Sequence, residues 1–222
     1  MIDPKIETAI GAALRAFSSY GSFDATPLTP KFDAIFSSDG DFMSKVESLD
    51  AVFDDQPKLE ALREVFFDLM LINFFSADVK KLEEDYLETK EWEEIEEQTL
   101  DRGTELLNLL LYLNECADED IEPGLEDYLK EFLLVDEDEF QDEYHIYEPV
   151  IDNQVLMESP VEEISAAAKA LADDSEIKEI FYPMMCFFQN AATGELEKDI
   201  IAKNAINKDF DMAVLEILVS FN

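Results

Sequence analysis

Apolar side chains recur every three or four residues along most of the chain, which is the spacing of one face of an α-helix. The longest pattern of this kind runs from Trp92 to Ala117, and we predict one continuous helix there. Its first turns carry glutamates around a single apolar face, whereas residues 106–113, LLNLLLYL, are apolar on nearly all sides. Because a helix that is apolar all round has neighbours on every side, this segment is predicted to be the centre of the fold.

Further helices are predicted on both sides of this central segment. Asp3 and Pro4 are the residue types of a helix cap and a first helical position, so a helix is expected from Pro4 until Gly21 ends it. Ser159 and Pro160 repeat that signal, with Ser159 as the cap of a capping box and Pro160 inside the helix. The remaining helices are expected at residues 30–36, 42–53, 57–76, 79–86, 125–133, 161–171, 177–188, 196–205 and 210–221.

The connections between these segments are short, which favours antiparallel helical hairpins. No repeat of fixed period occurs, and a short hairpin between Ile146 and Leu156 is the one strand pair that the sequence leaves open. We therefore predict an all-α fold, a multi-helix bundle of antiparallel helical hairpins around a long central helix, with at most a minor β-hairpin. Residues 1–148 are expected to form an acidic N-terminal part and residues 149–222 a C-terminal helical part, packed together as one globular unit.

The composition fits a folded but strongly charged protein. Of 222 residues, 47% are hydrophobic, which is enough for a substantial core, and only 6 are glycines. The formal net charge is −38, from 54 acidic and 16 basic residues. Self-repulsion on this scale opposes compaction, so the core, salt or a cationic partner has to offset it.

The cysteines and the first residues of the sequence lead us to expect a cytoplasmic protein. Cys116 and Cys186 lie in apolar helical runs and are expected to be buried, reduced thiols. The N-terminus lacks the basic start and the uninterrupted apolar run of a signal peptide. The most apolar window, residues 65–75, contains Asp68 and Asn73 and is too short to cross a bilayer.

Most catalytic and metal-binding patterns are missing from the sequence. His145 is the only histidine and is expected to be a hydrogen-bonded structural residue. The acidic run 118–122 has the spacing of a calcium loop, but Pro123 stands at the glycine position and Leu129 at the bidentate glutamate position. No glycine-rich phosphate loop occurs. We therefore expect no catalytic residue, no metal site and no cofactor, and we predict that the protein is not an enzyme.

One short stretch points to a different function. Residues 93–97, EEIEE, and residues 105–108, ELLN, resemble the EExxE and ExxD magnesium ligands of all-α nucleotide pyrophosphatases of the MazG type. The resemblance implies a magnesium-dependent nucleotide hydrolase with carboxylates on two facing helices around the metal. It covers about 21 of 222 residues, Asn108 replaces the last acid, and the predicted continuous helix carries both segments. This hydrolase is one alternative function.

The acidic residues are concentrated in one part of the chain. Residues 78–148 contain 27 acidic and 5 basic residues, a net charge of −22. Aromatic residues interrupt the acids between residues 136 and 144, and aromatic anchors in a field of one sign are typical of a docking surface. The residues predicted to bind a partner are Asp136, Glu137, Asp138, Glu139, Phe140, Asp142, Glu143 and Tyr144.

The charge defines the expected partner, a basic protein. Direct binding to nucleic acid is excluded because no basic patch exists to neutralise phosphates, and anionic membranes are disfavoured for the same reason. The function could be that of an inhibitor, a nucleic-acid mimic, an immunity protein against a basic toxin, or a chaperone, and the sequence does not separate these. A further alternative is an acidic structural scaffold whose charge serves solubility only. The sequence leaves the oligomeric state open.

Overall fold

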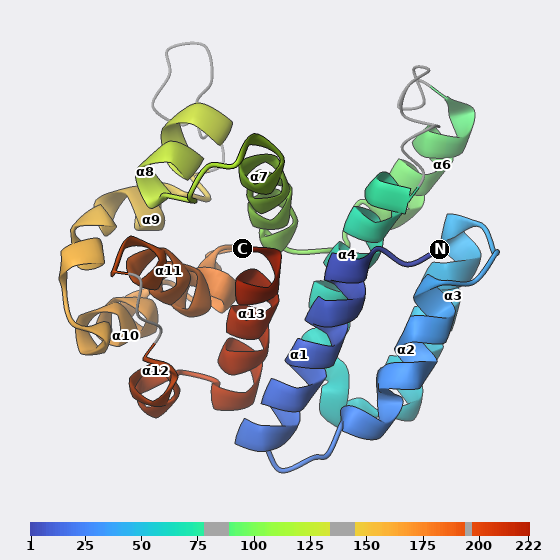
Figure 1. Ribbon diagram of the computed structural model, residues 1–222, viewed down its shortest axis with the longest axis horizontal. Coiled ribbons are helices and arrows are strands. Elements are labelled where there is room, and N and C mark those ends of the chain that lie inside the picture. The colour runs from blue at the N-terminus through green and yellow to red at the C-terminus, as the bar shows by residue number, and fades with distance from the viewer. Residues whose placement is uncertain (78–88, 134–144, 194–196) are drawn as a thin grey trace.

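The computed structural model describes residues 1–77, 89–133, 145–193 and 197–222. Every regular element within these ranges is helical, which confirms the predicted all-α fold (Figure 1). The elements of the first half are α1 (Pro4–Tyr20), η1 (Thr26–Leu28), α2 (Thr29–Phe36), α3 (Phe42–Asp55), η2 (Pro57–Leu62), α4 (Arg63–Ala77), α6 (Lys90–Thr99) and α7 (Leu106–Glu119). Those of the second half are α8 (Leu125–Asp127), η4 (Tyr128–Phe132), α9 (Glu148–Asp152), η5 (Gln154–Glu158), α10 (Val161–Ala170), α11 (Lys178–Thr193), α12 (Lys198–Asn204) and α13 (Lys208–Phe221).

The first and last helices lie side by side in the middle of the molecule. α1 packs lengthwise against α13, and α13 also contacts α7, α11 and α12 (Figure 1). The predicted start of α1 is confirmed, because the Asp3 carboxylate accepts a hydrogen bond from the Lys5 N–H at 2.7 Å. The last helix is part of the same core, since Phe210 and Phe221 are both buried. The sequence-distant ends of the chain therefore form one core.

Phenylalanine rings fill the space between α2, α3 and α4. The rings of Phe32 and Phe66 lie 4.7 Å apart between centroids, and Phe53 lies 5.7 Å and 5.8 Å from them. All three side chains are fully buried. Two of these ring pairs are tilted and the Phe53–Phe66 pair is edge-to-face, and such pairs contribute beyond the area that they bury.

The prediction of one continuous helix from Trp92 to Ala117 is wrong. Residues 100–105 belong to neither helix, so the segment forms two helices, α6 and α7. Gly103 has a φ of +88°, a left-handed conformation that glycine adopts without steric cost. The break is stabilised from outside the segment, because carboxylates of α4 accept hydrogen bonds from the Gly103 and Thr104 amides. The predicted burial of the apolar part is nevertheless confirmed, with Leu106 and Leu110 at 0% exposure and Leu113 at 1%.

The predicted capping box at the start of α10 is also wrong. The cap position is occupied by Pro160, and no side chain makes a capping hydrogen bond there. Ser159 lies one residue further out, where its carbonyl oxygen accepts a hydrogen bond from the Gln189 side chain of α11. The start of α10 is therefore shifted by one residue and held by α11.

The stretch in which a short hairpin was left open is helical. It contains α9 and η5, which pack against each other. Val150 and Leu156 of these elements are buried in the core. The predicted helix at residues 125–133 is divided into a short α-helical turn, α8, and a π-helical turn, η4. The helix predicted at residues 79–86 lies outside the described residues.

The most apolar window of the sequence lies in α4, which packs against α3 and α7. Within the described ranges, no helix combines the length and the apolar character needed to span a bilayer. Both cysteines are buried and neither forms a disulfide, which confirms the prediction for them.

Candidate functional site

The predicted partner-binding residues, Asp136 to Glu139, Phe140 and Asp142 to Tyr144, lie outside the described residues. The sequence that precedes them is described, and it forms a pocket between α7 and the short α8–η4 segment. The two elements are joined by a loop of residues 120–124. This pocket is the candidate functional site.

The loop after α7 folds α8 back beneath α7. Asp120 ends α7 in the left-handed conformation, with a φ of 58°, and the Ile121 N–H donates to the Cys116 carbonyl at 2.8 Å. A left-handed residue after a helix reverses the chain direction, and glycine or asparagine is the usual choice there. The turn of the chain therefore places α8 opposite the last two turns of α7.

Tyr112 fastens the two sides of the pocket together. Its hydroxyl accepts a hydrogen bond from the Gly124 N–H at 2.9 Å and lies 3.0 Å from Oδ2 of Asp127, to which it donates. Burial raises the pKa of the Tyr112 hydroxyl, so the phenol remains a protonated donor at neutral pH. The Phe132 ring stands edge-on to the Tyr112 ring, with 5.6 Å between their centroids.

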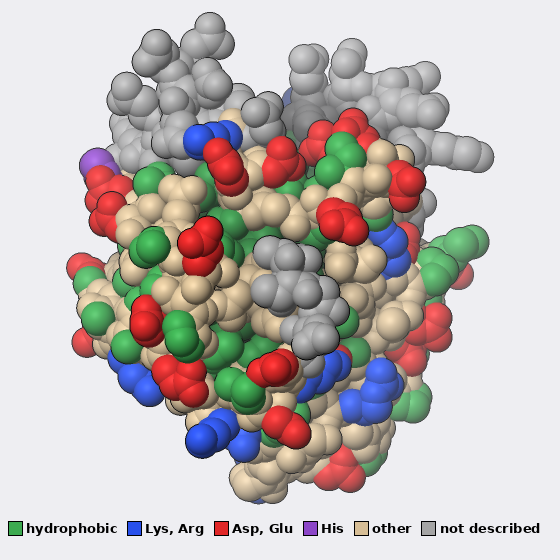
Figure 2. All heavy atoms as spheres, turned by 60° about the vertical axis from the view of Figure 1, so that its left-hand side comes forward, with side chains coloured by type: hydrophobic (Ala, Val, Ile, Leu, Met, Phe, Trp, Pro, Cys, Tyr) green, Lys and Arg blue, Asp and Glu red, His purple; other side chains and the backbone are tan. Residues whose placement is uncertain are grey.

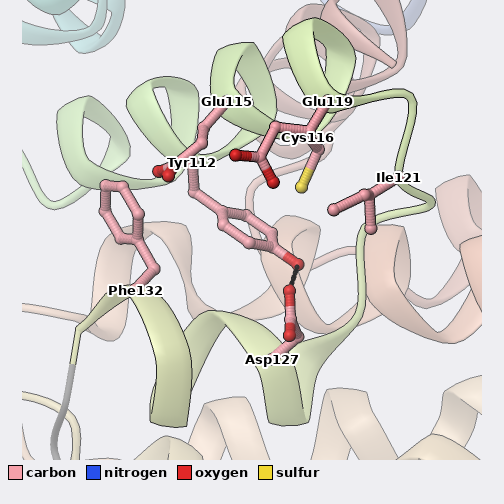
Figure 3. Close-up of a pocket in the computed structure, with 7 residues that line it drawn as sticks. All are labelled: Tyr112, Glu115, Cys116, Glu119, Ile121, Asp127 and Phe132. Carbon is pink, nitrogen blue, oxygen red and sulfur yellow. Dashed lines mark hydrogen bonds between the residues drawn. The ribbon is translucent and has the colours of Figure 1, made fainter.

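The pocket has a volume of about 340 Å³ and combines carboxylates with an aromatic surface. Figure 3 shows Glu115 and Glu119 projecting from α7 beside the Tyr112 ring, while Asp127 faces them from the opposite helix. Cys116 and Ile121 close the other end (Figure 3). Among the described residues that line this pocket, none is a lysine or an arginine.

The electrostatic potential in the pocket is negative for two separate reasons. The pKa of the Cys116 thiol is raised, first by burial and further by the charges of Asp127, Glu115 and Glu119. In addition, the pocket lies at the C-terminus of α7, where the helix dipole is negative and cations rather than acids are stabilising. The last turn of α7 contains no basic residue. The acids therefore stand at the end of the helix where they are least favourable.

A second cavity of about 620 Å³ adjoins the first and shares Cys116 and Ile121 with it. Its lining adds Asp120 and Glu122 from the loop and Phe221 from the end of α13. Acidic side chains thus surround the end of α7 on both sides. On the face turned forward in Figure 2, most of the visible lysine and arginine side chains lie in the lower half, away from the region of α7 and α8.

The residues behind the nucleotide-hydrolase resemblance do not converge. Glu93, Glu94 and Glu97 are exposed on α6, which is now a separate helix from α7. Glu105 instead accepts hydrogen bonds from the Tyr147 hydroxyl and from Nδ2 of Asn108, the latter at 3.0 Å. Among the described residues, no group of three or more histidine, cysteine, aspartate or glutamate side chains is arranged to hold a metal ion.

The structure also brings together a polar cluster that the sequence patterns did not predict. At the break between α6 and α7, Arg102 is bonded to Glu64 of α4 and Asp50 of α3, while Thr104 is bonded to Asp68 of α4. The signal in the sequence was the pair Glu64 and Asp68, one helical turn apart, within an otherwise apolar run. Charged residues on a predicted core face need partners, and these partners come from the turn at residues 102–104.

The chain matches no protein-family model, no curated protein and no solved structure.

Proposed function

We propose that this chain is a non-enzymatic acidic protein that docks a basic protein partner, with the pocket between α7 and α8–η4 receiving a cationic side chain. The observation that carries the proposal is the composition of this pocket. Glu115, Glu119 and Asp127 enter it from both sides, and Tyr112 supplies an aromatic ring. A cation beside an aromatic face and carboxylates gains from both the ring and the charges.

The free protein has an electrostatic reason to bind such a partner. Acidic groups at the C-terminus of a helix are destabilising by roughly 0.3–1 kcal/mol each, because they repel the negative end of the dipole. α7 ends with Asp118, Glu119 and Asp120, and Glu122 follows two residues later. A cationic side chain placed there removes this repulsion, so part of the binding free energy comes from relief of the unbound state.

The acidic segment that follows η4 in the sequence extends the same proposal. Residues 136–144 carry the predicted partner-binding acids and aromatics, and they come directly after the helices that form the pocket. Inhibitor, immunity protein, nucleic-acid mimic and chaperone all remain forms of this function. They differ in the identity of the basic partner rather than in the surface that receives it.

The proposal is tested with two variants of equal charge. Glu115→Gln with Glu119→Gln removes two charges from the pocket, and Glu47→Gln with Glu163→Gln removes two exposed charges from α3 and α10. Binding of an arginine-rich peptide is measured by calorimetry at one fixed ionic strength. We expect the pocket pair to weaken binding about tenfold, corresponding to about 1.4 kcal/mol, and the control pair to change it far less. Equal losses in both variants would mean that only net charge matters, and that the pocket is not the site.

The alternative of a magnesium-dependent nucleotide hydrolase gives a separate prediction. We expect no release of phosphate or pyrophosphate from a panel of nucleoside triphosphates with magnesium, because Glu97 is exposed on α6 and Glu105 is bonded to Tyr147. The measurement is a phosphate-release assay on the wild-type chain. Turnover that disappears in both Glu97→Gln and Glu105→Gln would establish the hydrolase in place of the non-enzymatic function.

A further inference from the structure

The turn between α6 and α7 is attached to the rest of the molecule by carboxylates. The Gly103 N–H donates to Oε2 of Glu64 at 2.8 Å, and the Thr104 N–H donates to Oδ1 of Asp68 at 3.1 Å. The Thr104 hydroxyl donates to Oδ2 of Asp68 at 2.6 Å and accepts the Leu106 N–H at 3.1 Å, which places it at the start of α7. All donors belong to the turn, and the acceptors across the contact are acidic side chains.

Asp68 occupies an unusual position in this contact. Its side chain is 0% exposed, and it faces two other acids, Glu64 on its own helix and Glu105 in front of α7. The positive charge of Arg102 is paired with other acids and not with Asp68. Its guanidinium is bonded to Glu64 and to Asp50 of α3, and its Cζ lies 4.7 Å from the centroid of the Phe67 ring. Glu179 of α11 adds a further acid near Glu64. Among the described residues, no ion pair reaches Asp68.

On the other side of the turn, Trp92 attaches α6 to α4. α6 exposes its acids, with Ile95 buried and Trp92 packed at 5.5 Å from the Phe75 ring of α4. The turn is tight as well, because a Cβ added at Gly103 would lie 2.7 Å from Oδ1 of Asp68. The position of α6 therefore depends on the hydrogen bonds of the turn to Asp68, Glu64 and Asp50 and on the packing of Ile95 and Trp92.

We propose that the Arg102–Thr104 turn is a proton-sensitive latch, in which loss of the proton from Asp68 loosens the turn and frees α6 from α4. A buried carboxylate beside two other acids and without a cation of its own is costly, and opening the turn to water relieves that cost. Protonated Asp68 keeps the turn closed. The latch itself does not depend on the proposed function, whereas its effect on partner binding, through the acids of α6, rests on that function.

The direction of the pH dependence follows from the burial. The pKa of Asp68 is raised from its ordinary value of 3.8 to about 8: burial is the largest cause, the hydrogen bonds from Thr104 act against it, and the charges of Glu64 and Glu105 act with it. In the open turn Asp68 is hydrated and has its ordinary pKa. Because the pKa is raised in the closed form, protonated Asp68 stabilises the closed turn. This stabilisation is complete below about pH 4 and is lost as the pH rises to about 8. Between these limits one proton is released on opening, so the equilibrium constant for opening rises about tenfold per pH unit.

Amide hydrogen exchange of Gly103, Thr104 and Leu106 measures this opening even when it is rare. After correction for intrinsic exchange, we expect the opening constant of the wild-type chain to rise about tenfold per pH unit up to about pH 8 and then to level off. In Asp68→Asn, which carries a neutral side chain of the same shape, the constant should not change with pH. The control is Asp211→Asn, which neutralises a buried acid of α13 and should keep the wild-type profile.

Acrylamide quenching of Trp92, the only tryptophan of the chain, shows whether α6 moves with the turn. We expect quenching to increase with pH in step with the opening of the amides. A wild-type opening constant that does not vary with pH would overturn the latch, and so would a pH profile that persists in Asp68→Asn. If circular dichroism shows that Asp68→Asn does not fold, the pH dependence of the wild-type opening constant tests the latch on its own. Pocket binding is not used in either measurement, so failure of the latch and failure of the proposed function are distinguishable.

Discussion

Two residues that flank α7, one before it and one after it, have left-handed backbone conformations, but only one of them is a glycine. Gly103 precedes the helix with a φ of +88°, and Asp120 ends it with a φ of 58°. Left-handed backbone costs a residue with a Cβ roughly 1–2 kcal/mol, although aspartate and asparagine tolerate it better than most. The two positions therefore respond in opposite ways to exchange with glycine and alanine.

We predict that Gly103→Ala destabilises the protein and that Asp120→Gly stabilises it. Alanine at position 103 adds left-handed strain and forces Oδ1 of Asp68 out of place, with an expected loss of about 2 kcal/mol or more. Glycine at position 120 relieves strain and removes an acid from the helix C-terminus, with a gain of about 1 kcal/mol. Urea denaturation at fixed salt measures both changes. Asp120→Asn keeps the strain but removes the charge, so it separates the two contributions.

The residue scale is also where sequence patterns were least informative. Gly103 fitted a helical pattern because glycine is tolerated on a helix face, and nothing local revealed its positive φ. The conformation depends on Glu64 and Asp68, which are more than thirty residues earlier in the chain. Spacing within one segment cannot report a hydrogen bond that another helix supplies.

At the scale of helices, the periodicity of apolar residues located the elements well. Segments with a strong face, such as those that form α1, α3 and α13, were predicted within a few residues of their observed ends. Two of the exceptions lie where the side chain of another helix makes hydrogen bonds to the backbone. The break before α7 is held by α4, and the start of α10 is shifted by the side chain of Gln189 on α11. The pocket beneath α7 could not be derived either, since it requires α8 to fold back beneath α7.

We predict that α7 provides a large share of the core stability. Leu110 is 0% exposed, and its helix α7 packs against α4 and α13, so Leu110→Ala leaves a cavity and should cost about 2–5 kcal/mol. Leu100, in the turn after α6, is 81% exposed, and Leu100→Ala should change stability by less than about 0.5 kcal/mol. Both values come from urea unfolding followed by circular dichroism. A small effect at Leu110 would show that α7 is not part of the cooperative core.

For the whole molecule, the net charge of −38 gives opposite responses of folding and of binding to salt. Raising the salt from about 0.01 M to about 1 M shortens the Debye length from about 30 Å to about 3 Å, which screens the repulsion among the acids. We predict that the unfolding midpoint of the free protein rises over this range. A midpoint that falls or stays constant would mean that the charges are already balanced locally and do not strain the fold.

Binding to a basic partner is expected to show the opposite dependence. The partner is first captured at low salt, and its association rate should then fall steeply as salt increases, since long-range attraction steers the encounter. Neutralising Asp136, Glu137, Asp138 and Glu139 together as amides should lower the association rate and flatten its salt slope, because these acids contribute to that attraction. The charge-matched control neutralises four exposed acids elsewhere, Asp39, Glu47, Glu163 and Asp174. Changes to Phe140 or Tyr144 should act mainly on the dissociation rate, as expected of aromatic anchors. If the captured partner is not basic, or if both quadruple variants associate at the same rate, the acidic segment is not the docking surface, and its charge serves solubility alone.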